Sequence, residues 1–170
     1  MKEQYTLTFY TEDQMGLVSK TAVIFSRRKI SFESFNISSC EINSMYRFTI
    51  VVTETFETVR NLALQIEKII DVYKCYWSTN SEIVYTQTAL FKLPTHVIIE
   101  EKVQDLLKQH NAHYKILERD YIIFEVTQQE TQIDFLTKEL TKHSIIEFVK
   151  SPRVALIKSG KGFTDELEGF

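Results

Sequence analysis

The chain has 170 residues, 44% of them hydrophobic, and a net charge of −3, which is enough for one domain or two small ones with proper cores. Its weak negative charge argues against binding nucleic acid through the phosphates. No segment approaches the roughly 18 apolar residues of a membrane span. The two cysteines lie far apart in the sequence and form neither a disulfide framework nor a metal motif. We expect a cytoplasmic globular protein that binds no nucleic acid, membrane or metal.

Apolar periodicity in the first half predicts strand, helix, strand, strand, helix, strand. Alternation from Tyr5 to Tyr10 predicts a half-buried strand. Val18, Ala22 and Phe25 recur at helical spacing, with Leu17 and Ile24 beside them, and predict one face of a helix. The other predicted segments are strands over 33–38, 46–53 and 72–77 and a helix over 59–70. This βαββαβ order is that of the ferredoxin-like unit, in which two helices cover one face of an antiparallel sheet.

The same order repeats after Ser78-Thr79-Asn80-Ser81, a polar stretch that we interpret as the boundary between two domains. The predicted segments are strands over 83–93, 114–117, 122–126 and 145–149, helices over 99–110 and 133–140, and an extended run over 154–157. We therefore predict an α+β protein of two ferredoxin-like halves, 1–79 and 80–158. The tail, 159–170, is expected to be loose unless a partner holds it.

Residues suited to catalysis are not gathered in any recognisable motif. His110 and His113 form the only close histidine pair, and it straddles a helix end and a strand start, so we interpret both as surface histidines. Glu12 and Asp13 lack a second catalytic group nearby and are interpreted as a solvated turn. Aromatic side chains on the predicted strands alternate as core residues do, which disfavours RNA base stacking; they are Phe32, Phe35, Tyr46 and Phe48.

The turn from Glu12 to Lys20 leads from the first strand into the first helix. The first backbone N–H groups of a helix have no partner within it, and with the helix dipole they favour an anion such as a carboxylate. Gly16 allows a close approach of the backbone. A plain helix start is the alternative interpretation, and only a family resemblance favours an effector site.

This turn carries that resemblance. Glu12-x-x-x-Gly16-x-x-Ser19-Lys20, followed by Phe25-Ser26-Arg27-Arg28-Lys29-Ile30-Ser31-Phe32-Glu33-Ser34, resembles the small, regulatory subunit of acetolactate synthase (acetohydroxyacid synthase), which reads E-N-x-x-G-x-L-S-R and then F-S-R-R-G-[FY]-N-I-E-S-L. The resemblance spans about 4–160. Further matching segments are Arg47-Phe48-Thr49-Ile50-Val51-Val52, Gln65-Ile66-Glu67-Lys68-Ile69-Ile70-Asp71-Val72, Ala89-Leu90-Phe91-Lys92-Leu93 and Arg153-Val154-Ala155-Leu156.

The resemblance implies that the first half is an ACT domain and that the chain has no catalysis of its own. It implies a homodimer that binds and activates the large catalytic subunit in valine, leucine and isoleucine biosynthesis. No cofactor is expected on this chain, and thiamine diphosphate, Mg²⁺ and FAD are expected on the catalytic partner. Feedback inhibition by a branched-chain amino acid, usually valine, is also implied, with the effector between paired ACT domains. The implied effector-binding residues are Asp13, Gln14, Met15, Gly16, Leu17, Ser31 and Phe32.

The chain departs from the family pattern at this site. Asp13 and Ser31 stand where the family has two asparagines, and Lys29 stands where it has glycine. An ionised Asp13 only accepts hydrogen bonds, and Ser31 lacks the paired functions of an amide. We expect valine binding to be weakened by roughly tenfold or more, altered or lost, with activation retained. The alternatives are a stand-alone ACT-type amino-acid sensor without an enzyme partner and, more remotely, a small RNA-binding module.

Overall fold

The computed structural model describes residues 1–12 and 15–159, except for the side chain of Met15. Its contacts divide the chain into two compact units. Unit 1 comprises residues 1–85 and the chain from Arg153 onward, and unit 2 comprises residues 86–152. These units differ from the ranges 1–79 and 80–158 expected from the sequence, because the chain leaves unit 1 within a strand and later returns to it.

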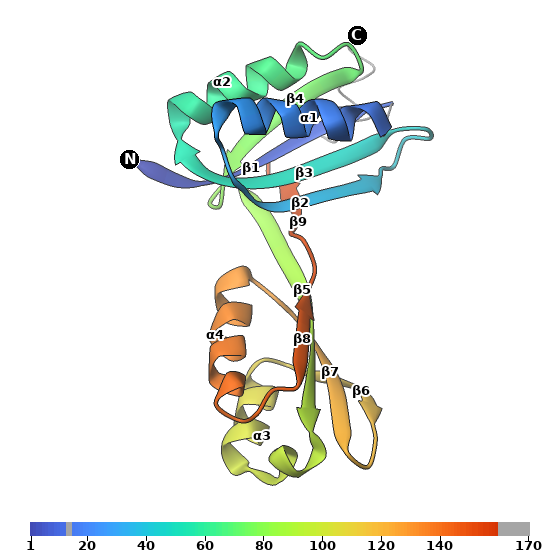
Figure 1. Ribbon diagram of the computed structural model, residues 1–170, viewed down its shortest axis with the longest axis vertical. Helices are drawn as coiled ribbons and strands as arrows, with labels where there is room; N and C mark the ends of the chain where they lie inside the picture. The colour runs from blue at the N-terminus through green and yellow to red at the C-terminus, as the bar shows by residue number, and fades with distance from the viewer. Residues whose placement is uncertain (13–14, 160–170) are drawn as a thin grey trace. The chain divides into compact units, whose positions relative to one another are not determined.

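Unit 1 is a ferredoxin-like βαββαβ unit, as predicted. Its antiparallel sheet has the order β2-β3-β1-β4, and α1 and α2 cover one face of it (Figure 1). At the start of α2, the side chain of the N-cap residue Thr55 accepts a hydrogen bond from Thr58 N–H. The elements are β1 (Lys2–Thr11), α1 (Met15–Arg28), β2 (Phe32–Ser39), β3 (Tyr46–Thr55), α2 (Phe56–Glu67) and β4 (Val72–Thr79).

The buried faces of the two helices differ in detail from those predicted. On α1 the predicted Leu17, Ile24 and Phe25 are buried, together with Thr21. Val18 and Ala22, which were predicted on the same face, are exposed. Helix α2 buries its predicted apolar stripe up to Ile66 but ends at Glu67. Ile70, predicted to continue the stripe, is therefore exposed.

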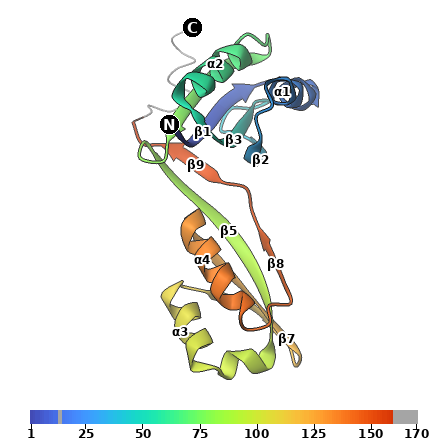
Figure 2. The same ribbon diagram turned by 60° about the vertical axis from the view of Figure 1, so that its left-hand side comes forward.

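Strand β1 is buried on both faces, although alternation predicted one. Leu7 and Phe9 belong to the core beneath the helices. Thr6 and Thr8 lie on the opposite face and are also buried. Strand β9 (Val154–Ile157) lies on this second side of the sheet, away from α1 and α2 (Figure 2). The return of the chain to unit 1 thus changes the environment of β1, which local periodicity does not report.

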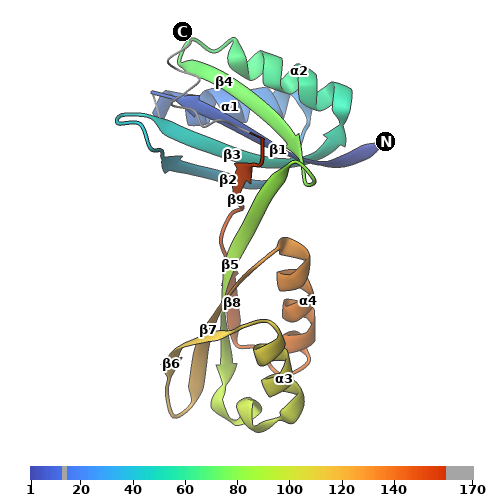
Figure 3. The same cartoon turned by 180° about the vertical axis from the view of Figure 1, so that it is seen from behind.

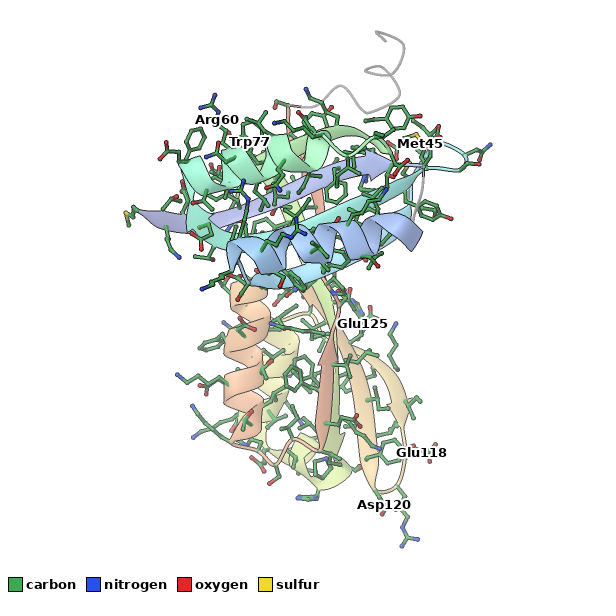
Figure 4. The ribbon with its side chains drawn as sticks, turned by 45° about the horizontal axis from the view of Figure 1, so that its top comes forward. Met45, Arg60, Trp77, Glu118, Asp120 and Glu125 are labelled. Carbon is green, nitrogen blue, oxygen red and sulfur yellow. The ribbon has the colours of Figure 1, made fainter. Side chains whose placement is uncertain are left out.

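Unit 2 repeats the predicted fold. Its core joins inward residues of the sheet to α3 and α4 on one face, and the β6–β7 hairpin forms one edge of the sheet (Figure 3). Glu118 and Asp120 lie at the tip of that hairpin (Figure 4), where a turn was predicted. The strand order is β6-β7-β5-β8, and β9 also pairs with β5. The elements are β5 (Ile83–Pro94), η1 (Thr95–Ile99), α3 (Glu101–Gln109), β6 (His113–Leu117), β7 (Tyr121–Gln128), α4 (Glu130–Thr141) and β8 (Glu147–Lys150).

Candidate effector site

The first part of the candidate site is the start of α1. Gly16 and Leu17 lie in its first turn, and Leu17 is fully buried in the core of unit 1. Asp13 and Gln14, like the side chain of Met15, lie outside the described residues. The first turn of α1 contains no acidic residue, so no carboxylate within the helix neutralises the positive end of its dipole. Leu17 anchors this end of the helix beside Gly16.

Two polar contacts hold this region to β4 and to the loop that precedes it. The Tyr73 hydroxyl donates a hydrogen bond to the Glu12 carboxylate, and this bond raises the pKa of Tyr73 because it favours the protonated phenol. Lys20 Nζ lies 2.8 Å from Asp71 Oδ2. Glu12, like Lys20, therefore takes part in a structural contact on the flank of the turn.

The second part of the site begins where α1 ends. Lys29 adopts a positive φ of 54°, its N–H donates to Ser26 O, and Ile30 N–H donates to Phe25 O, both at 3.0 Å. This is the Schellman pattern, in which the left-handed residue is usually glycine. The glycine of the family pattern thus corresponds to a left-handed helix cap, and Lys29 adopts the same conformation despite its Cβ.

Ser31 and Phe32 follow this cap at the start of β2, an edge strand of the sheet. Ser31 is exposed. Phe32 is 47% exposed, and its ring packs edge-on against Phe25 and tilted against Phe35, with centroids 5.8 and 5.5 Å apart. The prediction of core aromatics is confirmed for Phe48, which is fully buried, but not for Phe32.

The two parts of the site do not meet within one chain. Gly16 is at the beginning of α1, whereas Ser31 and Phe32 follow its end. A helix of 14 residues at 1.5 Å per residue separates them by roughly 20 Å. These two groups of candidate residues, called half-sites, are therefore too far apart within one chain for a single ligand of amino-acid size to contact both.

Arg153 is a residue of this unit that sequence reasoning overlooked. It is fully buried and donates hydrogen bonds to Thr6 Oγ1 at 2.9 Å, Asn80 Oδ1 at 3.0 Å and Gln4 Oε1 at 2.7 Å. Its backbone N–H donates to Ser34 Oγ at 3.1 Å. The only sequence signal was its place in the C-terminal family match, since an arginine is rarely fully buried.

The histidine pair behaves differently from the expectation of two surface residues. His113 is exposed, but the prediction is wrong for His110, which is buried. Its Nδ1 lies 2.7 Å from Gln128 Oε1, and its ring stacks on Phe135 with a centroid separation of 6.1 Å. His110 is thus a satisfied core histidine. Among the described residues, no three His, Cys, Asp or Glu side chains gather as a metal site would require.

Across residues 1–12 and 15–159, none of the helices has the length and apolar character needed to cross a membrane.

Comparisons with known proteins agree across both units. A family model described as the small subunit of acetolactate synthase matches residues 86–159. The acetolactate synthase small subunit of Bacillus subtilis is 27% identical over 159 residues, which cover 93% of this chain and 91% of that protein. Its counterpart in Mycobacterium bovis is 25% identical over 158 residues, covering 93% and 94%. The crystal structure of the Thermotoga maritima acetolactate synthase small subunit shares the fold, with a TM-score of 0.82 at 18% identity over 93% of this chain and 99% of that chain. The chain is thus similar to acetolactate synthase small subunits over 93% of its length.

Proposed function

We propose that this chain binds the thiamine-diphosphate-dependent catalytic subunit of acetolactate synthase and raises its activity in branched-chain amino-acid biosynthesis. The observation that carries this proposal is the similarity to small subunits over 93% of the chain, which includes both ferredoxin-like units. In this proposal thiamine diphosphate, Mg²⁺ and FAD are held by the catalytic partner, and this chain contributes no catalytic group.

The proposed effector is a branched-chain amino acid such as valine, bound between two copies of unit 1. Strand β2 is an edge of its sheet, and edge strands are open to pairing with another chain. Pairing at this edge would bring the Ser31–Phe32 half-site of one copy near the Gly16 half-site of its partner. This arrangement would supply both half-sites, which lie at opposite ends of α1 in one chain.

Each half-site would recognise a different part of the effector. The start of α1 at Met15, Gly16 and Leu17, preceded by Asp13 and Gln14, offers a positive dipole end for the α-carboxylate. The half-exposed ring of Phe32 offers an apolar surface for an aliphatic side chain.

The substitutions at this site favour weak binding. Ser31 provides one hydroxyl where the family pattern has an amide. Asp13, when ionised, opposes a carboxylate at the helix start, an effect of about 0.3–1 kcal/mol for an exposed charge. We therefore propose that effector affinity is reduced while activation of the catalytic subunit is retained.

Two experiments test these proposals separately. Co-expression with the affinity-tagged catalytic subunit from the same genome should recover this chain in the purified complex. A stand-alone amino-acid sensor would not be recovered. Titration calorimetry of the dimer with valine, leucine and isoleucine measures the effector site, and micromolar binding of valine would contradict the proposed weakening.

A further inference from the structure

The chain crosses between unit 1 and unit 2 at two places, and the unit 1 residues at both crossings touch. The crossings are between Tyr85 and Thr86 and between Pro152 and Arg153. The Arg153 guanidinium carbon lies 4.3 Å from the centroid of the Tyr85 ring, which is the geometry of a cation–π contact. Both connections to unit 2 are therefore fixed to each other inside unit 1.

This contact is part of a buried polar network that includes three other segments of unit 1. Arg153 donates to Thr6 on β1 and to Asn80 in the turn after β4. It also donates to Gln4 Oε1, which accepts a second hydrogen bond from Asn80 Nδ2 at 2.9 Å. Charge-assisted hydrogen bonds from a guanidinium are stronger than neutral ones and hold their acceptors in a fixed geometry.

The network reaches β2 by two routes. Arg153 N–H donates directly to Ser34 Oγ, and Gln4 Nε2 donates to Glu33 Oε2 at 2.7 Å. Both acceptors follow Phe32 immediately on the strand, at the point where the β2–β3 register shifts between Phe32 and Ser34. An irregular register leaves this part of the strand less constrained by its neighbour, so the side-chain bonds to Arg153 and Gln4 fix its position.

We propose that Arg153 is a positioning residue that couples the effector strand β2 to the two connections with unit 2. This inference rests on the proposed effector site, since it takes β2 to be the element that responds when the effector binds. A shift of β2 changes the Ser34 contact, moves Arg153 with its Tyr85 partner, and so reaches both connections together. Effector binding at the β2 edge of unit 1 thereby affects unit 2 through the two connections.

Thr88 and Ser151 serve as reporters in unit 2 because they lie close to the two crossings. Ser151 N–H donates to Thr88 O at 2.8 Å, and Thr88 N–H donates to Ser151 Oγ at 3.0 Å. These two residues belong to the two connecting segments, a few positions beyond Tyr85 and before Arg153. Their amide hydrogen exchange reports local opening where the connections enter unit 2.

The test compares hydrogen exchange in the full-length chain and its Ser34→Ala variant, with Ser38→Ala as the matched control. Ser38 is an exposed serine on the same strand. Losing one net hydrogen bond changes a local opening equilibrium by about fivefold. We expect Ser34→Ala to accelerate exchange of the Thr88 and Ser151 amides by about this factor and Ser38→Ala to leave both unchanged.

Unchanged exchange at Thr88 and Ser151 in Ser34→Ala would overturn the proposal, because the effect of losing the Ser34–Arg153 hydrogen bond would then be confined to unit 1. Arg153→Lys provides a second variant, since lysine keeps the charge but cannot form the fork of hydrogen bonds. It should accelerate the same two amides. Neither effector nor catalytic subunit is present in this measurement, so its outcome is independent of whether the chain activates acetolactate synthase.

Discussion

Arg153 packs over Tyr85, with its guanidinium carbon 4.3 Å from the ring centroid, although the two residues are far apart in sequence. The polar stretch from Ser78 to Ser81, interpreted from the sequence as the boundary between two domains, lies within unit 1. Asn80 in that stretch accepts a hydrogen bond from Arg153, and β5 continues from the turn through the limit of unit 1 at Tyr85. The boundary between the units is therefore crossed by a strand.

The first prediction concerns the stability contributed by Arg153. Arg153→Met keeps much of the side-chain volume but removes the donors to Gln4, Thr6 and Asn80. We expect the free energy of unfolding to fall by about 2–3 kcal/mol, because buried acceptors lose a charged partner. Urea unfolding followed by circular dichroism measures this change.

Lys158→Met is the matched control for that substitution. Lys158 Nζ donates to Ser81 O, but the side chain is exposed, so a change within about 0.5 kcal/mol is expected. Equal effects of the two substitutions would show that the buried network around Arg153 adds no stability.

The second prediction concerns the left-handed cap of α1. Lys29→Gly should raise the free energy of unfolding by about 0.5–1 kcal/mol, because glycine adopts a positive φ without the Cβ clash that Lys29 tolerates at 54°. Lys29→Ala retains a Cβ and should give no such gain. Thermal unfolding of the two variants side by side decides the point, and a gain shared by alanine would contradict this explanation.

The third prediction is a pH dependence at the β4–β5 turn. The Glu82 carboxylate accepts hydrogen bonds from Thr79 N–H at 2.7 Å and Thr79 Oγ1 at 2.9 Å, which lower the pKa of Glu82 from its usual 4.5. A carboxyl whose pKa is lower when folded stabilises the protein above its unfolded pKa, and this contribution is lost as the pH falls through the folded pKa.

Glu82→Gln should therefore lower the urea midpoint at pH 7, and this difference from the wild type should be smaller near pH 3, because protonation of the wild-type carboxyl removes its charge. The comparison needs both pH values in the same buffer system. A difference between wild type and variant that is as large at pH 3 as at pH 7 would show that the charge of Glu82 plays no part.

The fourth prediction separates the two cysteines. Burial raises the pKa of the Cys75 thiol, which lies in the core of unit 1, whereas Cys40 is only half-buried. Because the thiolate is the reactive form, a disulfide reagent at pH 8 should modify Cys40 first and Cys75 at least about 100-fold more slowly. Cys40→Ser should remove the fast phase, and two thiols reacting at one rate would contradict the assignment.

Local periodicity was sufficient to predict most elements of this fold. Alternation in β3 and the 3.6-residue stripe of α2 each depend on one sheet face or one helix face meeting a core, so the sequence of each segment reports its own burial. The prediction was only partly right on α1, where Leu17 and Phe25 face the core as predicted but Thr21 is buried and Val18 is exposed. An apolar side chain at Val18 and a polar one at Thr21 favoured the neighbouring face.

Long-range contacts account for what the sequence did not predict. Arg153 is buried by residues from β1, β2 and the β4–β5 turn, and His110 is buried between Gln128 and Phe135. No window of neighbouring residues contains those partners. At the candidate site, the positions of Gly16, Ser31 and Phe32 in the sequence did not reveal that α1 separates them into two half-sites.

The most direct test of the regulatory function is a titration of the catalytic subunit with this chain. The rate of acetolactate formation from pyruvate, with thiamine diphosphate, Mg²⁺ and FAD supplied, is measured at a fixed concentration of catalytic subunit. We predict a saturable increase in rate as this chain is added, with an equal concentration of an unrelated protein as the control. A rate that stays at the level of the catalytic subunit alone across the titration would contradict the proposed function.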